Sequence, residues 1–209
     1  MRRRPSPLCP RSDRVRSVAQ YVAMDQLRTR AKQRPRDPIN GRLPLRESKS
    51  SGREMYVLKP GIKADPHRQW SLPDRIFFGY GACHILAGVF LDQPPLPGFY
   101  AERVIPAQGF LGSHVYATNG VIVFDYHGYS KRDRLLEHHK RVWSSQYDGW
   151  LCAIERVDFK LLSTAELNMR QMWGPNQYLQ DPIPRARRFI EQRNHAKAAA
   201  KALANSRSA

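Results

Sequence analysis

The segment HVYATNGVIVFDY, residues 114–126, constrains the fold of this chain more than any other stretch. Two runs rich in β-branched and aromatic residues, which favour strands, flank Asn119-Gly120. Asn-Gly is typical of the type I′ turn of a two-residue hairpin, and this turn fixes the strand register. The predicted opposed pairs are Thr118 with Val121, Tyr116 with Val123, and His114 with Asp125. Opposed side chains share a face with Cβ atoms ~5 Å apart, so we expect His114 beside Asp125.

An apolar helix and a strand precede this hairpin. Residues from Gly81 to Leu91 are apolar on every side of a helix, which predicts a buried helix that carries Cys83. It has to end at residues 92–95, because Pro94 and Pro95 cannot continue it. Phe99 to Ile105 mixes β-branched and aromatic residues and predicts a strand. The pattern indicates an α+β fold, with an N-terminal cysteine-bearing helix packed on a small antiparallel sheet.

Three further elements are expected after the hairpin. A helix is predicted from about Ser130 to Trp143, with Ser130 as its cap. Residues 147–162 offer one or two strands. The sequence Ser163-Thr-Ala-Glu166 is a capping box that opens a short helix. His138 and His139 point about 100° apart on the first of these helices, so we expect them on a solvated face rather than on one metal ion.

The charge of the chain is concentrated in its two ends. The formal net charge is +17, but residues 55–184 carry 13 Lys and Arg against 12 Asp and Glu. Residues 1–54 are rich in Arg, Pro and Ser without apolar periodicity, so we expect a disordered basic segment, and the natural start could lie at Met24 or Met55. Residues 185–209 predict a basic, Ala-rich helix that is exposed. A single α+β domain is therefore expected over residues 55–184.

The composition also indicates which cellular compartment to expect. The chain has three cysteines, too few and too scattered for a disulfide framework, which favours a reducing, cytoplasmic location. The longest uncharged apolar stretch, residues 76–91, falls short of the ~20 residues that span a bilayer, so no membrane partner is expected. The basic start lacks the apolar segment of an export signal, although its Arg-rich character leaves a transit peptide open.

Cys83, His114 and Asp125 form the one constellation suited to covalent chemistry. A cysteine in the first turn of a helix lies where the helix dipole and unpaired N–H groups lower the pKa of its thiol. A thiolate nucleophile also needs an imidazole to carry the proton and an acid to orient that imidazole, and the hairpin supplies both. Core packing explains Cys83 equally well, because free cysteine is among the most buried residue types.

The segment from Gly79 to Gly128 resembles the transglutaminase-like branch of the papain-like cysteine enzymes. The similarity lies in the order Cys83-His-Ile-Leu-Ala-Gly, Glu102-Arg-Val, Ser113-His-Val-Tyr and Val123-Phe-Asp. It implies that Cys83 is the nucleophile, His114 the general base and acid, and Asp125 the orienting residue. The implied substrate is a peptide, protein or small amide, without a cofactor. The backbone N–H of Cys83 is one implied oxyanion donor, and Gln69 and Trp70 lie upstream where a second could come from.

Two other functions compete with this one. His114, Asp125 and His127 share a predicted face, and two histidines with one carboxylate can hold iron or another divalent metal. An inactive interaction domain with basic tails is the other alternative. Nucleic acid is an unlikely partner, because no nucleic-acid motif occurs in residues 55–184 and aromatic residues are sparse in the basic ends.

Overall fold

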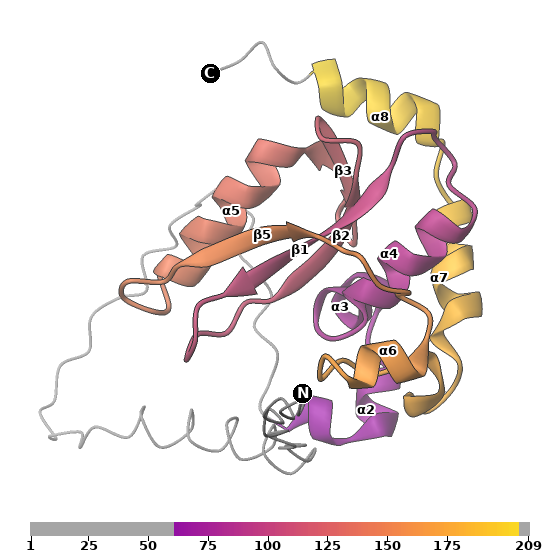
Figure 1. Cartoon of the computed structure of the whole chain (residues 1–209). Helices are drawn as coiled ribbons and strands as arrows, with labels where there is room; N and C mark the ends of the chain where they lie inside the picture. Colours follow the sequence, from indigo (N-terminus) through magenta and orange to yellow (C-terminus); the bar gives the residue numbers. More distant parts are fainter. Residues whose placement is uncertain (1–60, 205–209) are drawn as a thin grey trace, which may run out of the picture. The chain divides into compact units, whose positions relative to one another are not determined.

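The computed structural model describes residues 61–204 (Figure 1). This range is a mixed helix and sheet fold, with seven α-helices, two short 3-10 helices and one five-stranded antiparallel sheet. In chain order the elements are η1 (Ile62–Ala64), α2 (Pro66–Trp70), α3 (Asp74–Gly79), α4 (Cys83–Asp92), β1 (Tyr100–Pro106), β2 (His114–Thr118), β3 (Ile122–Asp125), β4 (Gly128–Lys131), α5 (Arg132–Ser144), β5 (Cys152–Arg156), α6 (Thr164–Asn168), η2 (Pro175–Gln177), α7 (Pro182–Glu191) and α8 (His195–Ala204). The predicted basic segment 1–54 lies outside the described residues.

The sheet has the strand order β4-β3-β2-β1-β5. Strands β1 to β4 follow one another as antiparallel neighbours, and β5 returns to pair with β1 at the other edge. The middle strand β2 is buried along its whole length. Its first residue, His114, pairs with Val104 of β1. The central strand therefore carries the predicted imidazole at one of its ends.

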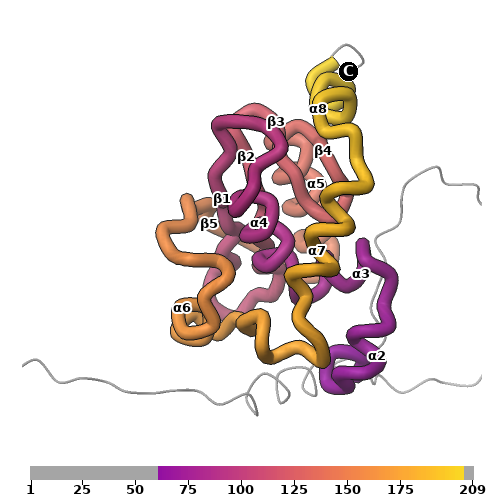
Figure 2. The backbone as a smooth tube through the Cα atoms, turned by 90° about the vertical axis from the view of Figure 1, so that its right-hand side faces the viewer, coloured from indigo at the N-terminus to yellow at the C-terminus, as the bar shows by residue number. Residues whose placement is uncertain are grey.

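Helices cover both faces of the sheet, with α5 on one side and α4 and α7 on the other (Figures 1 and 2). Ala117 and Phe124 share a core with α4 and α7, whereas Tyr116 and Val123 pack with Leu135 of α5. This division follows from the alternation of side chains along a strand. Helix α4 is apolar all round, as expected for a helix buried between the sheet and α7.

Helix α7 is part of this core, so the prediction of an exposed tail after Pro184 is wrong for this helix, whereas α8 is exposed along most of its length. Helix α7 buries Ala186, Phe189 and Ile190 in the same cluster as α4. Helix α8 buries two alanines against Ile122 of β3. The buried residues of α7 follow a helical i, i+3, i+4 spacing, and small alanine side chains let α8 approach the sheet closely. Such packing needs few large apolar residues, so the composition of residues 185–209 suggested an exposed helix although one face of α7 is buried.

The hairpin also differs from its prediction. Thr118 pairs with Val123 rather than with Val121, and Ala117 pairs with Phe124. Four residues therefore connect the paired positions in place of a two-residue turn. The side chain of Asn119 explains the longer connection, because its Oδ1 accepts hydrogen bonds from the N–H groups of residues 121 and 122. An Asx-type turn has replaced the expected type I′ turn.

Smaller corrections concern the segments after the hairpin. Ser130 lies in β4 and is not a helix cap, since α5 begins at Arg132 after Lys131. The capping serine of α6 is present, because Ser163 accepts a hydrogen bond from the N–H of Glu166. Cys152 begins the edge strand β5 and is exposed. No helix within residues 61–204 is long and apolar enough to cross a membrane.

Candidate active site

Cys83 is the first residue of α4, two residues later than the predicted start at Gly81, and it lies in the first turn of the helix as the sequence predicted. The preceding residue, Ala82, makes no side-chain capping hydrogen bond to the first turn of the helix. Cys83 is half-buried, whereas the seven residues that follow are buried. This position places the thiol at the positive end of the helix dipole, which favours a thiolate.

His114 and Asp125 meet beside it. Nε2 of His114 lies 3.2 Å from Oδ2 of Asp125, and the two residues expose only 4% and 3% of their surface. The observed register makes them diagonal rather than directly opposed, because Thr118 pairs with Val123 and Asp125 therefore falls opposite Tyr116. Diagonal neighbours on one face of a sheet stay within reach of long side chains, so the contact forms despite the changed turn.

Asp125 is held by a second histidine as well. Its Oδ1 accepts a hydrogen bond of 2.7 Å from the backbone N–H of His127, and Nδ1 of that ring lies 3.4 Å from Oδ2. Both imidazoles thus approach the same carboxylate oxygen. Among residues 61–204, no group of three or more His, Cys, Asp or Glu side chains is arranged to hold a metal ion. The metal alternative built on His114, Asp125 and His127 therefore stays a sequence prediction without structural support.

The charges of the three residues favour a thiolate beside an imidazolium. Burial raises the pKa of the Cys83 thiol, but its hydrogen bonds and charge interactions with His114 and His84 outweigh burial and hold that pKa well below its usual value. Burial lowers the pKa of His114, and its hydrogen bonds to Asp125 and Cys83 more than reverse this, so its pKa is raised. Burial raises the pKa of Asp125, whereas its bonds to His114 and His127 lower it strongly, with a net fall. The proton accordingly lies on the imidazole.

Comparisons with protein-family models, curated proteins and solved structures give no match. The function of the chain therefore has to be argued from the chemistry of the site itself.

Two side chains lie near the backbone that leads into Cys83. The Tyr178 hydroxyl donates a 2.7 Å hydrogen bond to the carbonyl of Gly81. A Cβ atom at Gly81 would lie 3.4 Å from Nε2 of Gln69, whose residue is only 6% exposed. The φ angle of Gly81 is +151°, which suits glycine. The Gln69 amide therefore lies against the main chain two residues before the thiol, at one of the two upstream positions that the sequence suggested.

Sequence reasoning missed His84. This residue is 4% exposed, and its Nε2 donates a 2.7 Å hydrogen bond to the carbonyl of Trp173. Its ring is the second imidazole that lowers the pKa of Cys83. The signal was present, because a histidine follows the cysteine directly, but its apolar neighbours indicated only a place in the core.

Sequence reasoning also misplaced His139. The predicted solvated helix face is wrong for this residue, because its ring stacks on His114 and its Nε2 lies 2.6 Å from the carbonyl oxygen of Gly112. His139 falls on the same helix face as Leu135, which is buried, and this periodicity was the available signal. Its neighbour His138 instead has its ring beside His127.

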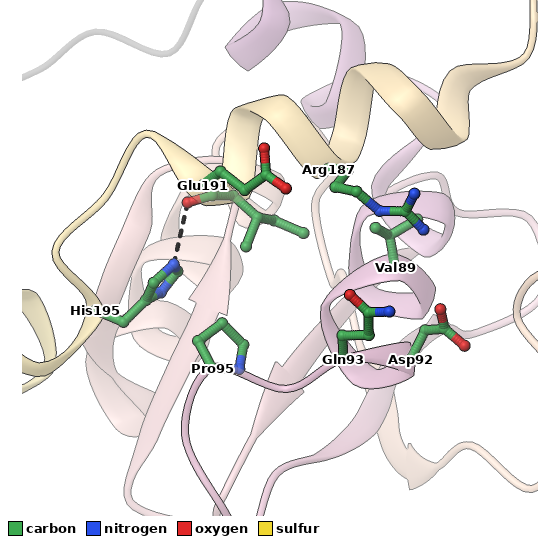
Figure 3. Close-up of a pocket in the computed structure, with 8 residues that line it drawn as sticks. Val89, Asp92, Gln93, Pro95, Arg187, Glu191 and His195 are labelled. Atoms are coloured by element: carbon green, nitrogen blue, oxygen red, sulfur yellow. Dashed lines mark hydrogen bonds between the residues drawn. The ribbon is translucent and has the colours of Figure 1, made fainter.

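A separate hollow lies at the other end of α4 (Figure 3). It is formed by the ends of α4 and α7 and the start of α8, and is lined by Val89, Asp92, Gln93, Pro95, Arg187, Ile190, Glu191 and His195. Asp92 is nine residues after Cys83 on the same helix, a rise of about 13 Å. None of the three predicted catalytic residues lines this hollow, so it is separate from the thiol site.

Proposed function

We propose that this chain is a thiol enzyme of the transglutaminase-like or papain-like type that acts on an amide or acyl bond. Cys83 is the nucleophile and His114 is the general base and acid. Asp125 orients the imidazole and stabilises its protonated form. The observation that carries the proposal is the buried contact of 3.2 Å between His114 and Asp125, beside a helix-terminal thiol of lowered pKa. A structural cysteine in an apolar core has its pKa raised, which is the opposite direction.

The reaction follows from these roles. Sγ of Cys83 forms a bond to the substrate carbonyl carbon, and the carbonyl π electrons move onto its oxygen. When this tetrahedral species collapses, the bond to the leaving group breaks and His114 protonates the departing nitrogen or oxygen. A thioester remains on Cys83. An acceptor then attacks the thioester while His114 removes its proton, and the thiolate is released. Water as the acceptor gives a peptidase or amidase, and an amine gives an acyl transferase.

The negative oxygen of the tetrahedral species needs hydrogen-bond donors. The backbone N–H of Cys83 is one, because no side chain caps the start of α4. Gln69 is the second in this proposal. It is buried, and its Nε2 lies against Gly81, two residues before the nucleophile. A side-chain amide there can donate without carrying a charge that would disturb the ion pair of Cys83 and His114.

The proposal is tested by the reactivity of Cys83 toward iodoacetamide between pH 4 and 10. The full chain carrying Cys9→Ser and Cys152→Ser leaves Cys83 as its only thiol. We expect an apparent pKa well below the ~8.5 of a free thiol, and His114→Ala should move it back toward that value. Labelling should also abolish acylation of the protein by a p-nitrophenyl ester, since both reactions use one sulfur atom.

Two results would overturn the proposed function. One is a Cys83 that stays unlabelled until the protein is denatured, which would make it a core residue. The other is labelling with an ordinary thiol pKa that His114→Ala leaves unchanged, because the thiol would then have no ion-pair partner. Cys83→Ser in the same background gives the matched blank for both reactions. Mass spectrometry of the labelled protein identifies the modified residue directly.

A further inference from the structure

A third imidazole, that of His139 in α5, lies against His114. The two rings are stacked, with their centroids 5.8 Å apart and their planes 16° from parallel. Nε2 of His139 is 2.6 Å from the carbonyl oxygen of Gly112. A carbonyl oxygen can only accept, so Nε2 carries a proton and donates it. His139 therefore acts on His114 in two ways, directly through its ring and indirectly through the backbone two residues earlier.

The loop that leads into β2 is anchored at three points. Trp150 Nε1–H donates a hydrogen bond of 2.8 Å to the carbonyl of Leu111. The Trp143 ring lies so close to Gly112 that a Cβ atom there would be 2.7 Å from it. The His139 bond is the third anchor. Gly112 also has a φ of +114°, so only glycine fits between the indole and the strand.

We propose that His139 is a positioning residue that holds the His114 ring in the orientation needed to exchange a proton with Cys83. This role rests on the function proposed above. The stacked ring of His139 restricts the rotation of the His114 side chain, and its hydrogen bond to Gly112 fixes the backbone from which that side chain projects. Displacement of a reacting group by about 1 Å can cost ~10²-fold in rate, so this support determines activity without touching a substrate.

The role requires a neutral His139. The pKa of His139 is lowered to about 4. Burial is the largest cause, and the charges of His114 and His138 lower the pKa further. The hydrogen bond to Gly112 and the charge of Asp125 raise it in part. A neutral ring with its proton fixed on Nε2 can stack on the His114 imidazolium without charge repulsion. Protonation would place two positive rings face to face in a buried site.

Two substitutions at His139 separate its ring from its hydrogen bond. His139→Gln keeps an N–H donor near the position of Nε2 and removes the ring, and His139→Phe keeps a stacked ring and removes the donor. Both are measured by iodoacetamide labelling of Cys83 against pH in the single-thiol background. We expect both to raise the apparent pKa of Cys83 by about one unit, which slows labelling by about tenfold at pH values below that pKa. The Gln variant should change less, because it keeps the backbone anchor.

His138→Gln is the matched control, since His138 is the adjacent residue of the same helix and its ring faces His127. It should label like the parent protein. If the parent shows the lowered pKa and its dependence on His114, but both His139 variants label like the parent, the positioning role is rejected and the proposed function stands. If Cys83 has an ordinary thiol pKa in the parent protein, both the proposed function and the positioning role of His139 are rejected.

If the His139 variants do not fold, a measurement on the His139 ring itself tests the positioning role. Nitrogen chemical shifts of the His139 ring, in the full chain labelled at its histidines, report which ring nitrogen carries the proton. We expect a neutral ring protonated on Nε2 from pH 8 down to about pH 5. A ring that titrates near the ordinary histidine pKa of about 6.5 would overturn the positioning role.

Discussion

His114 and Asp125 are hydrogen-bonded at 3.2 Å although they are not directly opposed in the sheet. Their contact crosses the strands diagonally, and the carboxylate is shared with His127. The imidazole of His114 is thus oriented by a group that is itself fixed on its far side, an arrangement in which neither partner rotates freely.

Asp125→Asn should separate the effect of Asp125 on the orientation of the His114 ring from the effect of its negative charge. The amide preserves the shape of the carboxylate and one acceptor oxygen, but it removes the negative charge that keeps the pKa of His114 raised. We expect the apparent pKa of Cys83 to rise by about one unit or more, which slows its labelling by about tenfold or more at pH values below that pKa. The measurement is the pH profile of iodoacetamide labelling. An unchanged profile would show that Asp125 does not act on the thiol through His114.

Gln69→Ala should affect acylation and spare alkylation. Iodoacetamide reacts without forming an oxyanion, whereas transfer of an acyl group from a p-nitrophenyl ester passes through one. Loss of one oxyanion donor costs about 10² to 10³-fold in rate. We therefore expect a loss of that size in acylation, with the labelling rate of Cys83 within about twofold of the parent. Equal losses in both reactions would mean that Gln69 supports the fold around Gly81 and does not act as a donor.

The stability of the protein should fall as pH drops below about 6.5 because of His139. Its pKa is lowered to about 4 in the folded protein, so between these values the unfolded chain binds a proton at this residue that the folded chain does not. The free energy of unfolding should lose up to about 3 kcal/mol across this window. Urea titrations at pH 7 and pH 4.5 measure the loss, and His139→Gln should reduce it. An equal loss in that variant contradicts the assignment.

Gly88→Ala should destabilise the protein even though alanine favours helices. A Cβ atom at this position of α4 would lie 2.9 Å from Cβ of Leu161 and 2.8 Å from Cδ2 of Leu162. Overpacking costs about 1 to 3 kcal/mol, against a gain of about 1 kcal/mol in helix propensity. We expect a lower Tm, and addition of Leu162→Ala should recover part of the loss. A higher Tm would show that residues 161–162 move away without cost.

Truncation after Pro184 should abolish the fold. Helix α7 then loses Phe189 and Ile190, which are 3% and 6% exposed in the core shared with α4. Loss of two such side chains costs about 5 kcal/mol or more, comparable with the whole stability of a domain. Near-ultraviolet circular dichroism should show the loss of fixed aromatic packing. Truncation after Ala204 is the control, and its spectrum should match that of the full chain.

The sequence predicted the neighbours in the sheet because side chains alternate with a period of two. The true register of the hairpin differs from the predicted one by two residues, and a shift of two leaves His114 and Asp125 on the same face. The place of Cys83 in the first turn of α4 was also predicted from the apolar run, and the two prolines gave the end of the helix. These features depend on local patterns.

The remaining contacts depend on how distant segments pack. Gln69 lies near Gly81 although the two residues belong to separate segments, and His84 bonds to a carbonyl 89 residues away. No local pattern specifies either contact. The burial of α7 was within reach, because Ala186, Phe189 and Ile190 have helical spacing, but the high arginine content of that segment suggested an exposed tail. Arginine can lay its stem and guanidinium on apolar or aromatic surface, as Arg193 does over Phe189.

The place of α7 and α8 in the core has a consequence for the order of events during synthesis. Cys83, His114 and Asp125 emerge from the ribosome well before the residues that complete the cluster around α4. At about 5 to 20 residues per second, residue 202 follows Asp125 by several seconds or more. The thiol, the imidazole and the carboxylate are therefore all made before the packing that fixes their mutual distances exists. A nascent chain therefore carries the three groups before α7 and α8, which complete the core around α4, have been made.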